Sequence, residues 1–302
     1  SSSIERLKAF EPQEGYYLAF SGGKDSVVCK ALLDMAGCKY DATYRVTSVD
    51  PPELVRFIKD KHPDVVREVP RYDNGKPITM WNLIPWKMYP PTRIARFCCE
   101  YLKESGGDGR MTVTGVRWAE SLNRKKNQAL VTIHGKQITP GFENDFKQDA
   151  RGRGIVLVND NDDSRRMVES CYKRHKTNVN PIIDWEDRDV WDFIKANGIE
   201  YCSLYNEGFH RLGCIGCPMA SQHRRELDFL RWPKYKGAYI RAFDKMLQLR
   251  IERNKKDPSR PVWRQGGIDG VVDAKSVYRW WMEYDTLPGQ YNLFEDYEDE
   301  ED

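Results

Sequence analysis

The chain lacks the long hydrophobic run that a membrane-spanning helix needs. None of its 302 residues lie in a segment approaching the ~20 consecutive apolar residues that cross a bilayer. Its first ten residues, SSSIERLKAF, hold no apolar core like that of a secretory signal. No internal repeat is visible, and the 40% apolar content is enough to fill a core. We therefore expect a soluble, non-repeating protein of the cytoplasm.

A strong net charge is also missing, although the charge is unevenly spread. The formal net charge is +2, yet residues 295–302, EDYEDEED, hold seven acidic side chains. Without these seven negative charges the chain carries +9. We interpret the tail as a solvated end; the alternative is a charge mimic that screens a basic groove.

Apolar runs alternate with amphipathic segments along most of the chain. Strands are expected at residues 14–20, 40–46, 64–69 and 111–115. Helices are expected from Lys24 to a stop at Gly37, at 51–62, and at 184–198 with Asp184 as N-cap and Gly198 as the stop. This order predicts an α/β fold with a mainly parallel sheet, whose ligands bind at the carboxyl ends of the strands.

Two regions depart from this alternation. Residues 122–165 are polar and rich in Arg, Lys, Asn and Gly, and we interpret them as an insertion with a hairpin at 129–142. Beyond residue 220 the sequence becomes basic, aromatic and helical. We expect a first domain at 1–220 and a helical extension at 221–302.

The string SGGKDS at 21–26 follows the first expected strand and opens the first expected helix. Gly22 and Gly23 allow a tight turn and a close approach of the backbone to phosphate oxygens. Lys24 supplies a cation, Ser21 and Ser26 supply hydroxyls, and the helix start supplies free amides. The spacing differs from that of the Walker A loop. We predict a phosphate site of another type, in preference to an ordinary Gly-Gly turn.

This string resembles the PP-loop of the adenine nucleotide α-hydrolase superfamily, whose members bind ATP and cleave it between the α and β phosphates. The resemblance implies a three-layer fold with helices on both faces of the sheet. It also implies nucleotide contacts by Ser21, Gly22, Gly23, Lys24, Asp25 and Ser26.

Further strings resemble the phosphoadenosine-phosphosulfate reductase branch of this superfamily. They are PPE at 51–53, TGVRWAESLNR at 114–124, and the block from Asn180 to Cys217. By this resemblance Arg117 and Arg124 face the anionic part of the nucleotide, with Gly115, Glu120 and Ser121 beside them. Arginine suits this task because its planar fork holds phosphate or sulfate oxygens in pairs.

The eight cysteines of a cytoplasmic chain favour metal or redox chemistry over disulfides. Cys98, Cys99, Cys214 and Cys217 resemble the ligands of the iron–sulfur type of adenylyl-sulfate reductase, with Lys103 offsetting the charge of a [4Fe-4S] cluster. A structural zinc and ordinary buried thiols are the alternatives. Cys171 and Cys202 are possible replacements for one ligand, and Cys29 and Cys38 are expected in or near the core.

Two departures from the reductases shape the functional hypothesis. No cysteine follows Cys217, whereas the reductases carry a nucleophilic cysteine near their C-terminus. The PP-loop is also intact, as in enzymes that use ATP. We therefore expect an ATP pyrophosphatase in sulfur transfer, with Lys24, Asp25, Arg117 and Arg124 as catalytic residues and Mg²⁺ and a [4Fe-4S] cluster as cofactors. A sulfonucleotide reductase and a non-catalytic nucleotide-binding subunit are the alternatives.

The substrate and partners follow from the same hypothesis. We expect ATP or adenylyl sulfate as the nucleotide, and a cysteine desulfurase or another sulfur or electron donor as partner. Arginines, lysines and aromatic residues alternate after residue 221, a mixture that suits a tRNA or DNA acceptor. The simpler interpretation is a helical extension with a solvated basic face.

Overall fold

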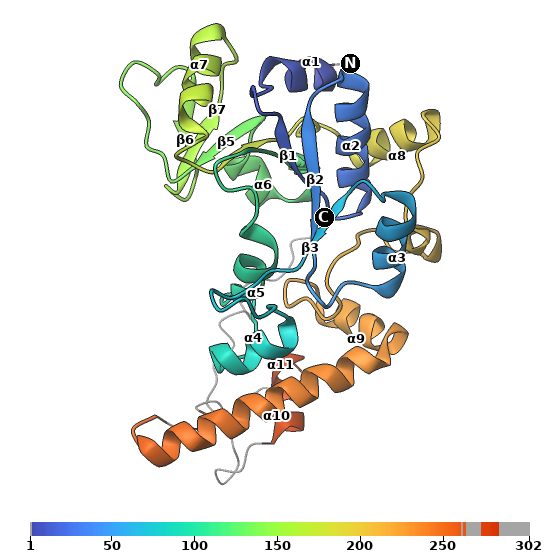
Figure 1. Ribbon diagram of the computed structural model, residues 1–302, viewed down its shortest axis with the longest axis vertical. Helices are drawn as coiled ribbons and strands as arrows, with labels where there is room; N and C mark the ends of the chain where they lie inside the picture. Colours follow the sequence, from blue (N-terminus) through green and yellow to red (C-terminus); the bar gives the residue numbers. More distant parts are fainter. Residues whose placement is uncertain (1, 261, 264–272, 284–302) are drawn as a thin grey trace, which may run out of the picture. The chain divides into compact units, whose positions relative to one another are not determined.

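The computed structural model describes residues 2–260, 262–263 and 273–283 (Figure 1). The chain divides into two compact units. The first holds residues 1–46, 52–69 and 103–213, and the second holds 47–51, 70–102 and 214–302. The second unit therefore includes more of the chain than the expected extension at 221–302. No helix of the described residues is long and apolar enough to cross a membrane.

The first unit is built on an eight-stranded sheet of order β3-β2-β1-β4-β8-β5-β7-β6. The first five strands in this order run parallel, and the last three are antiparallel to their neighbours. The strands are β1 Tyr16–Ala19, β2 Tyr40–Arg45, β3 Val66–Glu68, β4 Met111–Val113, β5 Val131–His134, β6 Phe146–Gln148, β7 Gly154–Leu157 and β8 Thr177–Val179. The prediction of an α/β fold with a mainly parallel sheet is confirmed.

Helices of the first unit accompany this sheet. They are α1 Ser2–Ala9, α2 Lys24–Ala36, α3 Pro52–Lys61, α6 Leu122–Asn127, α7 Asp162–Cys171 and α8 Asp187–Ala196, with the short helices η2 Trp118–Glu120 and η3 Ser203–Glu207. The one-turn helix η1, Glu100–Glu104, spans the border between the units. In α2 the apolar face buries Val28, Leu32 and Leu33 completely. This helix runs beside β1 and β2 in Figure 1.

The expected hairpin at 129–142 is wrong. β5 pairs with β8 and β7, and residues 136–139 form no strand. Residues 122–165 thus extend the sheet through three antiparallel strands, seen with α7 at one end of the first unit (Figure 1). A hairpin is predicted from local turn chemistry, whereas β5 pairs with β8 and β7, which are distant from it in sequence.

The expected start of the helix at 184–198 is also wrong. α8 begins at Asp187 with Glu186 as its N-cap, and Gly198 follows its end with a φ of +59°. Asp184 instead forms a two-pronged ion pair with Arg6 of α1, at 2.7 Å for each bond. A long-range partner has replaced the local capping role that the sequence favoured.

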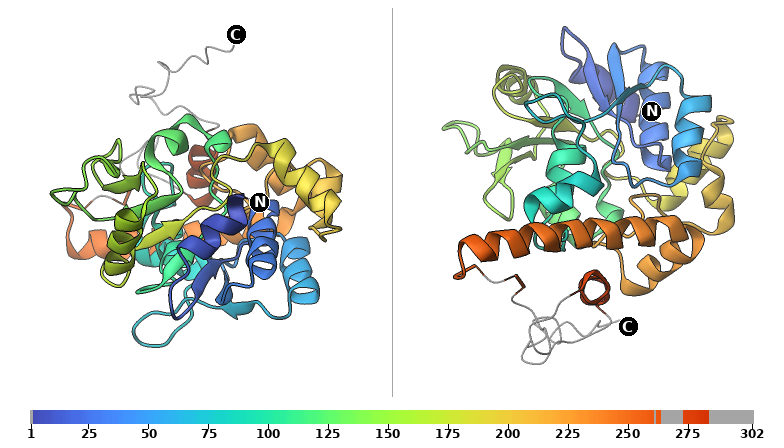
Figure 2. Two further views of the ribbon diagram at one scale, coloured as in Figure 1. Left: turned by 90° about the horizontal axis from the view of Figure 1, so that it is seen from above. Right: turned by 60° about the horizontal axis from the view of Figure 1, so that its bottom comes forward.

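The second unit is helical in its described residues. It holds α4 Met80–Lys87, α5 Phe97–Cys99, α9 Gln222–Arg231, α10 Pro233–Lys256 and α11 Ala274–Trp281. The long helix α10 runs along this unit, with α11 beside it (Figure 2). Trp81 of α4 meets Tyr239 of α10 edge to face, with ring centroids 5.2 Å apart. Aromatic rings therefore contribute to the packing between α4 and α10.

We predict that Gly22→Ala lowers the free energy of unfolding more than Gly37→Ala. The two glycines flank α2 with φ values of +73° and +69°. A Cβ at Gly37 meets no atom within 4 Å, whereas at Gly22 it would lie 2.7 Å from Ile58 Cγ1. We expect a loss of ~1–2 kcal/mol for Gly37→Ala from the backbone alone, and ~1–3 kcal/mol more for Gly22→Ala from the clash. Urea unfolding measures both; equal losses would contradict the packing described for Gly22.

Candidate functional site

The candidate site lies at the carboxyl ends of β1 and β4, where the sequence placed it. After β1 the chain turns through Ser21, Gly22 and Gly23 into the first turn of α2. Ser26 Oγ donates to the Gly23 carbonyl at 2.9 Å, and the Ser21 amide donates to Ser26 Oγ at 3.3 Å. The two serine hydroxyls therefore fix the shape of the loop from within.

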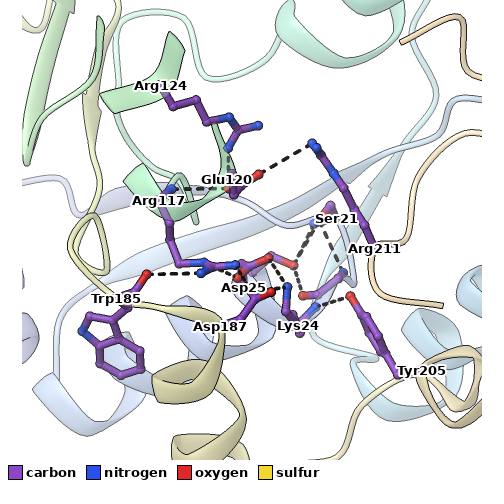
Figure 3. A network of polar contacts seen from close by, with 12 residues as sticks. Ser21, Lys24, Asp25, Arg117, Glu120, Arg124, Trp185, Asp187, Tyr205 and Arg211 are labelled. Atoms are coloured by element: carbon purple, nitrogen blue, oxygen red, sulfur yellow. Dashed lines mark hydrogen bonds and ion pairs between the residues drawn. The ribbon is translucent and has the colours of Figure 1, made fainter. Parts of the chain in front are cut away.

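A tyrosine closes this loop from another part of the chain. Tyr205 of η3 accepts a hydrogen bond from the Lys24 amide at 2.9 Å (Figure 3). Burial raises the pKa of Tyr205, so the hydroxyl stays neutral. Trp191 of α8 packs edge to face on its ring, with centroids 5.1 Å apart. The amide at the start of α2, a group suited to phosphate, is thus engaged by a hydroxyl that a ligand oxygen can replace.

Four charged side chains meet at the start of α2, and we call them the ion-pair cluster: Lys24, Asp25, Arg117 and Asp187 (Figure 3). Lys24 Nζ lies 3.4 Å from Asp25 Oδ2 and 3.3 Å from Asp187 Oδ1. Arg117 Nε lies 2.8 Å from Asp25 Oδ1, and its Nη2 lies 2.5 Å from Asp187 Oδ1. Each cation therefore contacts both carboxylates.

The two cations of the ion-pair cluster are buried, with 4% of Lys24 and 2% of Arg117 exposed. Burial acts to lower the pKa of Arg117, but the charge of Asp25 and the hydrogen bond to Asp187 raise it above its usual value. Burial acts to raise the pKa of Asp187, but the hydrogen bond from Arg117 and the charge of Lys24 lower it. Arg117 and Asp187 are thus ionised at neutral pH.

Close backbone packing places Arg117 in this cluster. A Cβ on Gly115, after β4, would lie 2.8 Å from Asp25 Cβ, so only glycine lets this segment approach α2 so closely. Arg117 also donates through Nη1 to the Trp185 carbonyl at 3.2 Å. The close packing of this segment on α2 therefore requires the glycine of the Thr-Gly string after β4.

A second set of charges surrounds Glu120. Its Oε1 accepts from the Arg117 amide at 3.3 Å and from Arg124 Nη1, and its Oε2 lies 3.8 Å from Arg211 (Figure 3). Burial lowers the pKa of Arg124, and the charge of Glu120 opposes this. Ser121 accepts from the Arg124 amide at 3.2 Å as the N-cap of α6. Two guanidinium groups against one carboxylate leave a net positive charge, which suits an anionic ligand.

The structure brings together the residues expected for the nucleotide site, from Ser21 to Ser26 and from Gly115 to Arg124. It adds three that sequence reasoning missed: Asp187, Tyr205 and Arg211. Asp187 stood in the 180–217 block, but an acid near the start of a helix is equally typical of favourable helix-dipole placement. Tyr205 and Arg211 carried no local signal, because their partners are 181 and 91 positions away.

The four cysteines expected as metal ligands lie in the second unit, and we call them the cysteine group: Cys98, Cys99, Cys214 and Cys217. A hydrogen bond with Cys99 raises the pKa of Cys98, and burial and the charges of the other three thiols raise it further. All eight cysteines of the chain are described, and none forms a disulfide. The other three thiols thus interact with Cys98 and oppose its ionisation.

The chemistry of the donor set, four thiols, fits a metal group. Among the described residues, no three His, Cys, Asp or Glu side chains stand ready to hold a metal ion. Four thiols in one aromatic unit match the ligands of a [4Fe-4S] cluster or a zinc ion. The assignment of these four residues as ligands stays a prediction. Cys171 and Cys202 belong to the first unit, where both are buried, as are Cys29 and Cys38.

We predict that Asp187→Asn makes the stability of the protein less sensitive to acid. A carboxylate whose folded pKa lies below its unfolded value of ~3.9 stabilises the fold above that value and loses this effect as the pH falls through the folded pKa. The melting temperature of Asp187→Asn is therefore expected to be lower than that of the wild type near neutral pH and to converge with it as the pH falls through the lowered folded pKa of Asp187.

Asp192→Asn is the matched control for this measurement. Asp192 lies on the same helix and pairs with Arg188 at 3.3 Å on the exposed surface. Such a pair contributes little, so this variant should follow the wild type at every pH. Parallel melting curves for Asp187→Asn and the wild type would contradict the ionisation described for the ion-pair cluster.

Comparisons with known proteins identify the family of the chain. Residues 15–220 match the phosphoadenosine phosphosulfate reductase domain. An uncharacterized protein of Methanocaldococcus jannaschii is 25% identical over 256 residues, covering 82% of this chain and 50% of that protein. Adenosine 5'-phosphosulfate reductase of Neisseria meningitidis serogroup B is 40% identical over 162 residues, covering 48% of this chain and 57% of that protein.

Among solved structures, the phosphate complex of phosphoadenylyl-sulfate reductase from Candida auris covers 71% of this chain and 88% of its own, at 13% identity and a TM-score of 0.40. The chain spans about half the length of the curated relatives it matches, 40% to 57% for three of them. Since the match at 15–220 takes in well over half of the residues, the chain belongs to the phosphoadenosine phosphosulfate reductase domain family.

Proposed function

We propose that the chain binds Mg²⁺-ATP at the SGGKDS loop and cleaves it to AMP and pyrophosphate, activating an acceptor for sulfur transfer. The observation that carries this proposal is the ion-pair cluster at the start of α2. There two buried cations, Lys24 and Arg117, are held by the carboxylates of Asp25 and Asp187. Buried cations at a helix start are preorganised for phosphate oxygens.

The ion-pair cluster explains how a polyphosphate would bind. Phosphate oxygens would take the place of the carboxylates as partners of Lys24 and Arg117, so that no desolvated cation loses its counter-charge. The Asp25 and Asp187 carboxylates would then be available as hard oxygen ligands, directly or through water, for the Mg²⁺ that bridges the phosphates. Asp187 is suited to this exchange because 69% of its side chain is exposed.

The reaction would be an in-line displacement at the α-phosphorus. An acceptor oxygen forms the new bond, the bond from the α-phosphorus to the bridging oxygen breaks, and pyrophosphate leaves with the electron pair. Lys24 and Arg117 offset the charge that grows on the α-phosphate and the leaving group, and Arg124 adds positive charge beside them. A sulfur nucleophile then displaces AMP from the activated acceptor.

The cysteine group would hold a [4Fe-4S] cluster, with zinc as the alternative metal. Such a cluster, when bound, supplies a place to hold a sulfide or braces the second unit. A tRNA or DNA acceptor and a cysteine desulfurase donor remain part of the proposal, supported by the basic and aromatic composition after residue 221. We propose that the reaction takes place in the cytoplasm.

A second candidate function is the reduction of adenylyl sulfate. It is favoured by the relative that is 40% identical and carries the name of that reductase. The guanidinium groups of Arg117 and Arg124 would hold sulfate as readily as phosphate. This reaction additionally requires a thiol that attacks the sulfur and a reductant that releases sulfite. A non-catalytic nucleotide-binding role is the third candidate.

We predict that the wild-type protein, purified without oxygen, cleaves α-labelled ATP in the presence of Mg²⁺. The products are AMP, which keeps the label, and pyrophosphate. Lys24→Met should lower the rate ~10²–10³-fold, since it removes a buried cation aimed at the developing charge. Lys30→Met is the matched control, because Lys30 lies on the same helix but pairs with Asp64 at 2.9 Å. Separation of the labelled nucleotides gives the rates.

Unreacted ATP in the wild-type sample would contradict the first candidate. Release of sulfite and AMP from adenylyl sulfate with a thiol donor would then establish the reductase. ATP binding without turnover of either nucleotide would establish the non-catalytic role.

A further inference from the structure

Two helices, α9 and α10, form hydrogen bonds to the CxxC loop of the cysteine group. Both lie beyond residues 15–220, the range matched to the family domain. Asp228 of α9 accepts from the Gly216 amide at 3.2 Å, and Tyr239 of α10 donates to the Ile215 carbonyl at 3.0 Å. Gly216 has a φ of +69°, and a Cβ there would lie 2.5 Å from the ring of Phe229. The match to the family domain ends at residue 220, so α9 and α10 support the loop from outside the matched residues.

A buried arginine stands in the same helix as Asp228. Arg225 is 1% exposed, and its Nη1 donates to the Trp281 carbonyl at 2.6 Å. Its guanidinium lies over the Trp281 ring, 5.6 Å from the centroid, and the edge of that ring lies 3.2 Å from a Cβ built on Gly216. Arg225 is therefore packed against the residues that surround the CxxC loop.

The charge of Arg225 is poorly compensated by the described carboxylates. Its Nε has no hydrogen-bond partner among the residues that the structure describes. Its Nη2 lies 3.1 Å from Glu283 Oε1, but 53% of the Glu283 side chain is exposed, so water screens this pair. The nearby Asp228 carboxylate already accepts from Gly216 and from Arg224 Nε, the latter at 3.1 Å. A buried guanidinium without a full counter-charge is costly unless a further anion faces it.

The cysteine group is the source of such an anion. Burial lowers the pKa of Arg225, while the charge of Glu283 acts to raise it. Thiolates bound to a [4Fe-4S] cluster or to zinc keep a net negative charge, whereas free thiols at neutral pH have none. A bound metal group would therefore supply the negative counter-charge that the Arg225 guanidinium lacks.

We propose that Arg225 is the buried cation that offsets the negative charge of the metal group held by Cys98, Cys99, Cys214 and Cys217. This inference rests on the proposed metal binding by the cysteine group and assigns Arg225 a positioning and charge-balancing role. It does not make Arg225 a catalytic residue, and it holds for either metal because both thiolate complexes are anionic.

The test compares metal retention in the full chain for wild type, Arg225→Met and Arg225→Lys. Each protein is loaded with iron and sulfide, or separately with zinc, and titrated with a chelator while bound metal per chain is measured. We expect Arg225→Met to lose half of its metal at a chelator concentration ~10-fold lower than the wild type does. Residues that interact with the metal ligands typically contribute 10–100-fold to metal affinity. Arg225→Lys, which keeps the charge, should retain most of the affinity. Arg241→Met on the exposed face of α10 is the control.

Thermal melts separate this role from a purely structural one. If Arg225 only forms its hydrogen bond to Trp281 and its ion pair with Glu283, Arg225→Met should lower the melting temperature equally in the metal-free and metal-loaded proteins. The charge-balancing role predicts a clearly larger loss in the loaded protein. Equal metal retention by Arg225→Met and wild type would overturn the inference about Arg225 alone. A wild-type chain that retains neither metal would overturn the metal site, and the inference with it, while leaving ATP cleavage to its own test.

Discussion

The ion-pair cluster at the start of α2 is the constraint on which the first unit depends. Lys24 and Arg117 are desolvated, and a desolvated cation is tolerable only with a counter-charge in contact. Asp25 comes from the same helix turn, but Asp187 comes from α8, 162 positions later in the chain. The sheet must therefore bring the ends of β1 and β4 and the start of α8 to one place. The close packing of Gly115 against Asp25 shows how little room that arrangement leaves.

The same cluster connects stability with binding. The carboxylates stabilise the two cations, and the Tyr205 hydroxyl accepts a hydrogen bond from the Lys24 amide. Each of these partners is one that a phosphate oxygen can replace without leaving a donor unsatisfied. Arg124 and Arg211 add positive charge around Glu120 at the edge of the site. In the proposed function, the arrangement acts as a preformed anion site whose own carboxylates occupy the place of the ligand.

Much of this could be read from the sequence, and the failures have a common cause. The strands β1 to β4 and the helix α2 follow from local apolar patterns, Gly22 and Gly37, and they were predicted within a few residues. The hairpin at 129–142 and the cap at Asp184 failed because long-range partners, β8 and Arg6, determined the outcome. Tyr205 and Arg211 reach the candidate site only through tertiary contacts, with Lys24 and Glu120 respectively. A single sequence does not indicate contacts between residues so far apart. Residues 70–102 likewise belong to the second unit because of their tertiary packing, and no local sequence pattern predicts this assignment.

The most direct test of the account is a crystal structure of the protein with Mg²⁺ and α,β-methylene-ATP, an analogue that cannot be cleaved at the α–β position. The account predicts phosphate oxygens bound to the Lys24 amide, Lys24 Nζ and the Arg117 guanidinium, with the Tyr205 hydroxyl displaced and Asp25 or Asp187 facing the metal. A nucleotide bound elsewhere, or one bound while all four ion pairs between Lys24, Arg117, Asp25 and Asp187 stay closed, would contradict it.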